Sequence, residues 1–162
     1  MIKRKNGTRW KTNDKKERSI KFEKTMKEHA QNFLEDNRNE CYLFLKKVED
    51  PESFGIAWLG EDGEIVSIRE KPSKPDSNLA ITGLYLYTSK VFDMIDTSLE
   101  EVGYSDRGEL EISDINRFFM ERGEAKGIAF DCHWADCGTI DSLLDTSNLV
   151  KKWDHNQNLS GH

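Results

Sequence analysis

The sequence predicts an α/β fold, because segments with the pattern of β-strands alternate along the chain with segments of helical periodicity. Two dense apolar runs, at residues 41–47 and 79–87, have the length and composition of strands. Residues 111–122 instead place apolar side chains on one face of a helix. With 162 residues, 36% of them apolar and 33% charged, the chain can form one domain with a modest core.

The N-terminal region predicts a basic arm followed by a helix. Residues 1–29 hold eleven Lys and Arg against four Asp and Glu. Residues 1–19 show no periodicity, so we expect them to form a disordered arm. From Phe22 to Leu34, apolar residues recur every three or four positions, which indicates an amphipathic helix. No aromatic or glycine-rich recognition pattern accompanies the basic charge, so a nucleic-acid partner is not expected.

The middle of the chain predicts three further strands and a loop. The run at 41–47 is typical of a strand buried on both faces. Segments 54–59 and 65–69 flank an Asp-Gly pair, which favours a tight β-hairpin. Residues 71–78 contain two prolines and must form a loop.

The following strand, 79–87, has Gly83 in its middle. A glycine inside a strand usually marks a place where a ligand or another backbone approaches closely. A short helix is expected at 89–95. After it, the sequence predicts a loop at 103–109, a helix at 111–122 and a strand at 125–130. A turn at 133–138 and a closing helix at 140–153 follow. Residues 154–162 form a polar tail, so the folded domain is expected to comprise 20–153.

Polar clusters follow or interrupt several of these strands. In an open α/β sheet, ligands bind at the carboxyl ends of strands. Lys71 and Arg107 could pair with a phosphate, and Glu70 could accept hydrogen bonds from sugar hydroxyls. Asp136 is a candidate ligand for Mg²⁺, which prefers hard oxygen donors. Taken one at a time, each of these residue types is more often a surface charge than a ligand, so residue types alone leave the function open.

A second cluster, around Cys132, His133 and Cys137, contains side-chain types that bind zinc. Structural zinc sites usually draw on two separated ligand pairs, and only one cluster exists here, so zinc is the weaker interpretation. A Cys–His nucleophile also lacks a third orienting group. Three cysteines argue against a disulfide scaffold, and no apolar stretch reaches the ~20 residues of a membrane span. We therefore expect a cytoplasmic protein without a membrane partner.

Five motifs, FGIA, REKP, AITGLY, RGELE and WADCGT, occur in a fixed order over residues 41–150. In order and spacing this region resembles the glucose-1-phosphate thymidylyltransferases, which are sugar-1-phosphate nucleotidyltransferases. The resemblance covers only their sugar-phosphate-binding half. It implies a Rossmann-like mixed sheet and a Mg²⁺-dependent reaction. In that reaction the phosphate of glucose 1-phosphate attacks the α-phosphorus of dTTP, giving dTDP-glucose and pyrophosphate.

The resemblance also implies roles for individual residues. Lys71 and Arg107 would contact the sugar phosphate as the catalytic cations, and Asp136 would be one of two aspartates that hold Mg²⁺. The residues implied to bind sugar hydroxyls or to line the sugar pocket are Gly55, Glu70, Ile81, Gly83 and Tyr85. Because like-charged phosphates repel each other, such a site works by positioning and by cationic clamping.

Two family motifs are missing from this sequence. The family's nucleotide loop has the pattern G-x-G-T-R with a following proline and lysine, whereas residues 6–9 offer only Asn-Gly-Thr-Arg. Residues 14–20 lack the Leu-Gly-Asp-Asn motif that carries the second metal aspartate. We therefore expect an incomplete sheet without its first nucleotide-binding strands, and a chain that is inactive alone.

Two functions remain open after these departures. The first is an enzyme half that is active only if another chain or an upstream segment supplies the nucleotide-binding half. The expected protein partner is a chain that carries that half, or a second copy in a homo-oligomer. The second is a non-catalytic protein that keeps the sugar-phosphate pocket for binding, assembly or regulation. Both predict the same pocket residues, and only the first requires a partner that supplies the glycine-rich loop.

Overall fold

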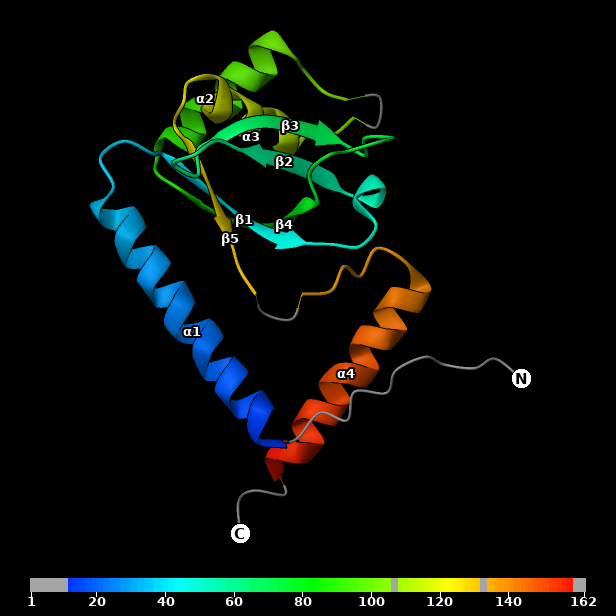
Figure 1. Ribbon diagram of the computed structural model, residues 1–162. Coiled ribbons are helices and arrows are strands. Elements are labelled where there is room, and N and C mark those ends of the chain that lie inside the picture. The colour runs from blue at the N-terminus through cyan, green and yellow to red at the C-terminus, as the bar shows by residue number, and fades with distance from the viewer. Residues whose placement is uncertain (1–11, 106–107, 132–133, 159–162) are drawn as a thin grey trace. The chain divides into compact units, whose positions relative to one another are not determined.

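The computed structural model describes residues 12–105, 108–131 and 134–158, with side chains described only within 24–151. The chain divides into two compact units. The terminal unit combines Met1–Glu28 with Cys132–His162, and the sheet unit is His29–Asp131. Helix α1 (Thr12–Glu35) runs from the first unit into the second, and α4 (Ile140–Asn158) belongs to the terminal unit (Figure 1).

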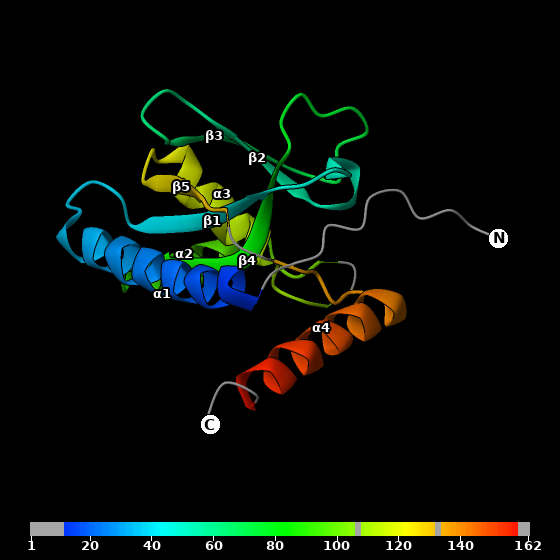
Figure 2. The same cartoon turned by 60° about the horizontal axis from the view of Figure 1, so that its bottom comes forward.

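The sheet unit contains a five-stranded mixed sheet (Figures 1 and 2). The strand order is β3-β2-β4-β1-β5. β1 and β5 are parallel, and all other neighbours are antiparallel. The strand bounds are Cys41–Lys47, Gly55–Leu59, Ile65–Glu70, Leu79–Tyr87 and Ala125–Ala129 for β1 to β5. These bounds agree closely with the predicted strands, and the predicted α/β class with a mixed sheet is confirmed.

One face of the sheet is covered by α2 (Lys90–Glu101) and α3 (Ile112–Glu121). Alternate residues of β1 point to this face, as the period of two in a strand requires. They form one core cluster with side chains of both helices and of β2, β3 and β5. The buried members are Cys41, Leu43, Leu45, Ala57, Ile65, Met94, Ile115, Phe118, Phe119 and Ala125.

The other face of β1 packs against the end of α1. The rings of Phe33 and Tyr42 lie 4.9 Å apart, and those of His29 and Phe44 lie 6.0 Å apart, both in edge-to-face geometry. Residues 41–45 are therefore at most 2% exposed. This confirms the prediction that the strand at 41–47 is buried on both faces.

The β2–β3 hairpin forms as predicted. Gly63 adopts a φ of +80°, which a residue with a Cβ rarely takes, and the Gly60 N–H donates to the Glu64 carbonyl at 2.9 Å. The Gly127 N–H of β5 donates to the Gly63 carbonyl at 2.9 Å. The hairpin turn thus also contacts β5, so the sheet curls until β3 and β5 approach each other.

Three helices extend beyond their predicted bounds. α1 begins at Thr12, so residues 12–19 of the expected disordered arm are helical. Lys, Glu and Arg there have high helix propensity, which an apolar periodicity does not register. α2 continues to Glu101, whereas the sequence predicted an end near residue 95. The apolar pattern stops there because the next buried residue of the helix is a serine, Ser98. α4 reaches Asn158, so residues 154–158 of the expected polar tail are helical as well.

Gly83 lies in a bulge of β4. Leu43 of β1 pairs with Tyr85, but Leu45 pairs with Ile81, so β4 uses two more residues than β1 over this stretch. Gly83 has a φ of +78°, and the Thr82 hydroxyl donates to the Phe44 carbonyl at 2.8 Å. The bulge keeps Ile81 and Tyr85 on the same face of the sheet, since an even number of residues is added.

We predict that Gly83→Ala lowers the free energy of unfolding by about 1–2 kcal/mol, because a Cβ disfavours the left-handed backbone. A Cβ at this position meets no atom within 4 Å, so the loss comes from the backbone and not from a clash. Urea unfolding measures it. Gly83→Asn is the matched variant, since asparagine tolerates this conformation, and it should lose less. An equal loss for both variants would contradict this explanation.

Asp36 joins the end of α1 to β1. Its carboxylate accepts hydrogen bonds from the Tyr42 hydroxyl at 2.7 Å, the Arg38 N–H at 2.8 Å and the Asn39 N–H at 3.0 Å. The Asn39 side-chain amide donates a fourth bond at 2.9 Å. Burial alone would raise the pKa of Asp36, but these bonds together hold it well below its ordinary value.

We predict that Asp36→Asn lowers the free energy of unfolding at pH 7 by about 1–2 kcal/mol, because bonds to a charged acceptor are lost at a partly exposed site. A lowered pKa in the folded state stabilises the fold above the unfolded pKa of about 3.9. This contribution disappears as the pH falls from there toward the folded pKa. Urea midpoints of the two proteins should therefore converge below about pH 4, and a constant gap from pH 7 to pH 3 would contradict the prediction.

Candidate functional site

Three of the predicted sugar-site residues come together at one end of the sheet, each from a different strand. Gly55 of β2 pairs across the hairpin with Glu70 of β3. A Cβ built on Gly55 would lie 2.9 Å from the Glu70 Oε2 and 4.0 Å from the Ile81 Cδ1 of β4. The missing side chain of Gly55 therefore leaves the space into which the Glu70 carboxylate extends.

Lys71 follows directly after Glu70, in the loop that leads to β4. Its φ is +43°, the only positive φ of a non-glycine residue within the described ranges. Its N–H donates to the Phe54 carbonyl at 3.0 Å, while its side chain is exposed. A left-handed backbone costs a lysine about 1–2 kcal/mol, and such strain is concentrated at functional sites. Lys71 thus starts from a hydrogen-bonded backbone position next to Glu70 and has an exposed cationic side chain.

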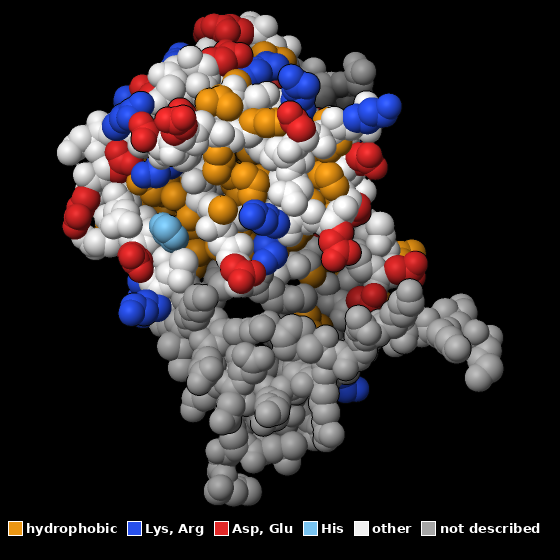
Figure 3. Space-filling view, viewed as in Figure 1, with side chains coloured by type: hydrophobic (Ala, Val, Ile, Leu, Met, Phe, Trp, Pro, Cys, Tyr) orange, Lys and Arg blue, Asp and Glu red, His pale blue; other side chains and the backbone are white. Residues whose placement is uncertain are grey.

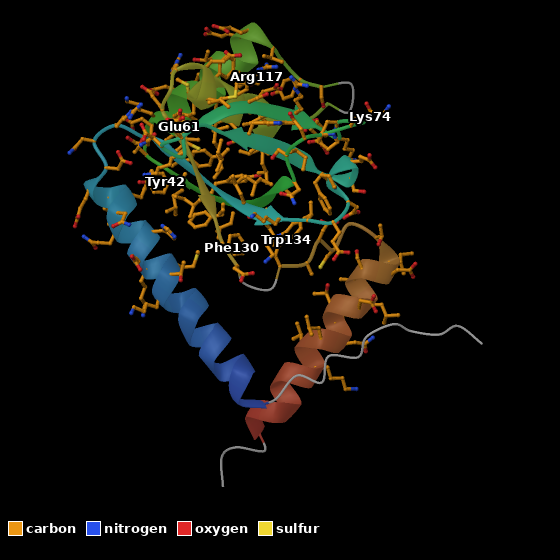
Figure 4. The ribbon with its side chains drawn as sticks, in the orientation of Figure 1. Tyr42, Glu61, Lys74, Arg117, Phe130 and Trp134 are labelled. Atoms are coloured by element: carbon orange, nitrogen blue, oxygen red, sulfur yellow. The ribbon has the colours of Figure 1, made fainter. Side chains whose placement is uncertain are left out.

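The loop that carries Lys71 is also tied to β2 at its far end. The Ser77 hydroxyl donates to the Ala57 carbonyl at 2.7 Å, and the Trp58 indole N–H donates to the Asp76 carboxylate at 2.6 Å. Glu61 lies in the turn of the β2–β3 hairpin, and Lys74, in the middle of this loop, lies at the opposite end of the hairpin (Figure 4). The candidate cluster therefore occupies the loop end of the hairpin.

Tyr85 of β4 lies on the same face of the sheet as Ile81, and both pack against the core cluster. Its ring centroid is 5.7 Å from that of Tyr87. Burial raises the pKa of Tyr85, a hydrogen bond with Asn116 lowers it, and the charges of Cys41 and Glu70 raise it further. Tyr85 is thus half-buried and within electrostatic reach of the Glu70 carboxylate.

The remaining predicted site residues are not part of this cluster. Gly83 is exposed and has open space above its Cα, in the bulge described above. Arg107 lies outside the described residues. Asp136 is exposed in the terminal unit, where its Oδ2 accepts a hydrogen bond from the Gly138 N–H at 3.1 Å.

The metal predictions find no built site in the described part of the chain. It contains no group of three His, Cys, Asp or Glu side chains that could hold a metal ion. A single carboxylate at Asp136 has the chemistry of a Mg²⁺ ligand but does not make a site. The weaker zinc interpretation depended on Cys132 and His133, which lie outside the described residues.

Asn116 was not predicted as a functional residue. It lies on α3, is 1% exposed and is among the few buried polar side chains of the described residues. Its position could have been found in the sequence. Asn116 lies four residues after Ile112 and three before Phe119, on the face of a helix whose other inward residues are apolar. A polar residue on an apolar face is an informative observation.

A shallow hollow of about 380 Å³ lies apart from these residues, beside the end of α1. Asn32, Asp36, Tyr42 and Lys126 are among the residues that line it. Asp36 already accepts four hydrogen bonds there, so the hollow belongs to the anchor between α1 and β1.

On the face shown in Figure 3, acidic and basic side chains are interspersed with apolar patches. No helix in the described ranges is long and apolar enough to cross a membrane.

Comparison with known proteins places this sheet in a family. Residues 16–152 match the family model of the nucleotidyl transferases. This chain belongs to the nucleotidyl transferase family. The resemblance carried by its five motifs is thereby confirmed at the level of the family.

The similar proteins are glucose-1-phosphate thymidylyltransferases. The enzyme of Mycolicibacterium smegmatis is 39% identical over 119 residues, and that of Neisseria meningitidis is 37% identical over 123 residues. Each match covers 72% of this chain but 40% of the relative, so the chain spans well under half of these curated relatives. A crystal structure of a Bacillus anthracis protein assigned to the same activity, solved with sucrose, has a TM-score of 0.62 at 38% identity. That match covers 75% of this chain and 47% of the other.

We predict that Gly55→Ala weakens binding of glucose 1-phosphate at least tenfold with a change in unfolding free energy below about 1 kcal/mol. The new Cβ displaces the flexible end of Glu70, which costs little in folding but moves the carboxylate. Calorimetric titration and urea unfolding measure the two effects.

Gly60→Ala is the matched control for this variant. Its Cβ would displace the flexible carboxylate of Glu64, at the turn end of the same hairpin. Affinity for the sugar phosphate should therefore stay unchanged in Gly60→Ala. Equal losses of affinity in both variants would show that the Gly55 effect is a general disturbance of the hairpin.

Proposed function

We propose that this chain supplies the sugar-phosphate half of a sugar-1-phosphate nucleotidyltransferase acting on glucose 1-phosphate and dTTP. The observation that carries the proposal is the meeting of Gly55, Glu70 and Ile81 at one end of the sheet. These residues come from three strands and from three separate motifs, and the motifs imply a sugar-binding role for each of them. Membership of the nucleotidyl transferase family and the names of the similar enzymes support it further.

In the proposed site, the Glu70 carboxylate accepts hydrogen bonds from sugar hydroxyls over the backbone of Gly55. Ile81 forms an apolar wall, Tyr85 adds a phenol on the same face, and the bulge at Gly83 keeps the backbone open beside them. Such a site orients the sugar by a few hydrogen bonds placed on a rigid sheet, where positioning contributes most to phosphoryl transfer.

The phosphate end is assigned to the cations. Lys71 contacts the sugar phosphate as a point charge, and Arg107 provides a guanidinium that can bind it with two parallel hydrogen bonds. Together they offset the repulsion between the sugar phosphate and the triphosphate, so that a phosphate oxygen can attack the α-phosphorus and release pyrophosphate.

Under this proposal the nucleotide half is supplied by another polypeptide or by a segment upstream of these 162 residues. The sequence lacks the G-x-G-T-R loop and the second metal aspartate. Asp136 would be the residue of this chain that supplies a carboxylate to Mg²⁺ in the assembled enzyme. Alone, the chain is expected to bind the sugar phosphate without releasing pyrophosphate from dTTP. Turnover by the isolated chain would overturn this division of roles.

We predict that Lys71→Gly weakens binding of glucose 1-phosphate at least tenfold, since a charge-assisted bond worth about 1.5–3 kcal/mol is lost. The same substitution should leave the free energy of unfolding unchanged or raise it by up to about 1 kcal/mol, because glycine adopts the φ of +43° without strain. Calorimetric titration and urea unfolding separate the two effects, which have opposite signs.

Lys74→Gly serves as the control, because it removes an exposed lysine from the middle of the same loop. It should change neither the affinity nor the stability by more than a small amount. If Lys74→Gly weakens binding as much as Lys71→Gly does, the loop acts only through its general positive charge. If neither variant affects binding, Lys71 is not part of the site.

A further inference from the structure

β4 has a partner strand along one edge but over only two residues of the other. On the first edge, β1 pairs with the whole of β4 apart from the bulge. On the second edge, β2 pairs only with Leu79 and Ala80, and it starts at Gly55, one position beyond this pairing. Among the described residues, no strand pairs with the second edge from Gly83 to Tyr87. We call this stretch the open edge of β4.

The side chains of the open edge are less buried than those of the strand beside it. Leu84 is 38% exposed, and Leu86 is partly exposed on the same face of the sheet. Residues 41–43 of β1, which pair with residues 85–87, are at most 2% exposed. β4 stands in the middle of the strand order, where a strand is normally covered on both edges. The open edge therefore has the exposure of an edge strand at the centre of a sheet.

The open edge also lacks the features that keep edge strands from pairing. Such strands usually carry charged side chains or proline, because their unpaired N–H and C=O groups can bond another strand. The two outermost strands follow this rule, with Arg69 and Glu70 in β3 and Lys126 in β5. Residues 79–88 contain neither a charge nor a proline. Nothing in the sequence of the open edge therefore opposes the addition of a strand.

We propose that the open edge of β4 is a self-association surface, where a second copy of this chain pairs its own β4 in antiparallel orientation. A two-fold axis brings the same stretch of both copies together, so each open edge covers the other and the assembly closes as a dimer. Main-chain hydrogen bonds supply the affinity, as in other cases of strand addition.

A second copy fits this edge better than a charged strand would. Antiparallel pairing of two neutral strands places no like charges opposite each other. The stretch from Gly83 to Tyr87 is about as long as a typical strand, so the pairing can use all of it. The exposed Leu84 side chains of both copies become covered at the same time. This inference is independent of the proposed function, because it rests on strand pairing and not on a ligand.

The experiment measures the mass of the full chain by analytical ultracentrifugation over a range of micromolar concentrations. The mass should rise from one copy to two and no further. Amide hydrogen exchange, measured over the same range, should slow about tenfold or more within residues 83–87 as the dimer forms, because the outward N–H groups become bonded. This exchange measurement needs no substitution, so it tests the proposal even if a variant fails to fold.

Leu84→Lys and two controls locate the interface. A lysine is tolerated at the exposed position 84 but places a charge on the open edge, so it should weaken dimerisation at least tenfold. Val66→Lys adds the same charge to an exposed position of β3 and should dimerise like the unaltered chain. Leu144→Lys does so on α4, which exposes the apolar side chains of Ile140, Leu143 and Leu144, and it should also dimerise normally.

Three results would overturn the proposal. The first is a mass of one copy at every concentration, which is also the result expected if the open edge accepts only a strand of a nucleotide-binding half. The second is a dimer whose β4 amides exchange as fast as those of the monomer. The third is a dimer that survives Leu84→Lys and is lost in Leu144→Lys, which would place the interface on α4. Binding of glucose 1-phosphate is a separate measurement, so failure here leaves the proposed function standing.

Discussion

The burial of β1 on both of its faces is the constraint on which the rest of the structure depends. Residues 41–45 are almost completely excluded from solvent, with α2 and α3 against one face and the end of α1 against the other. A strand in this position cannot shift by one residue without turning every side chain to the wrong face. Because β4 and β5 both pair with β1, its register fixes theirs.

The candidate site follows from that fixed register. β4 carries Ile81 and Tyr85 on the core face of the sheet, and the bulge at Gly83 restores this alternation after a local departure. The β2–β3 hairpin then brings Gly55 and Glu70 beside Ile81. The strained backbone of Lys71 is tolerated because its loop is hydrogen-bonded at both ends, to Phe54 just before β2 and to Ala57 and Trp58 within β2. Rigid elements thus hold the exposed side chains of Glu70 and Lys71 near Ile81, which packs against the core.

The family assignment and the architecture agree that this chain carries part of a nucleotidyl transferase fold. It matches a nucleotidyl transferase model over residues 16–152 and covers 40% of the length of similar thymidylyltransferases. The residues that gather at the loop end of the hairpin belong to the motifs for which we propose a sugar-binding role. The proposed reaction therefore requires a nucleotide-binding half with the glycine-rich loop, from another polypeptide or from a segment upstream of these residues.

The sequence by itself determined the strands, the hairpin and most of the sugar-site candidates, because period-two patterns, an Asp-Gly turn and ordered motifs are local signals. The predicted ends of α1, α2 and α4 were wrong, because charged or polar helix formers or a buried serine stand there in place of apolar residues. Only the tertiary structure decided that Gly83 serves a bulge, that Lys71 is strained and that the buried Asn116 accepts a hydrogen bond from Tyr87. These features depend on pairing between strands and on hydrogen bonds between residues distant in sequence, and no local pattern encodes them.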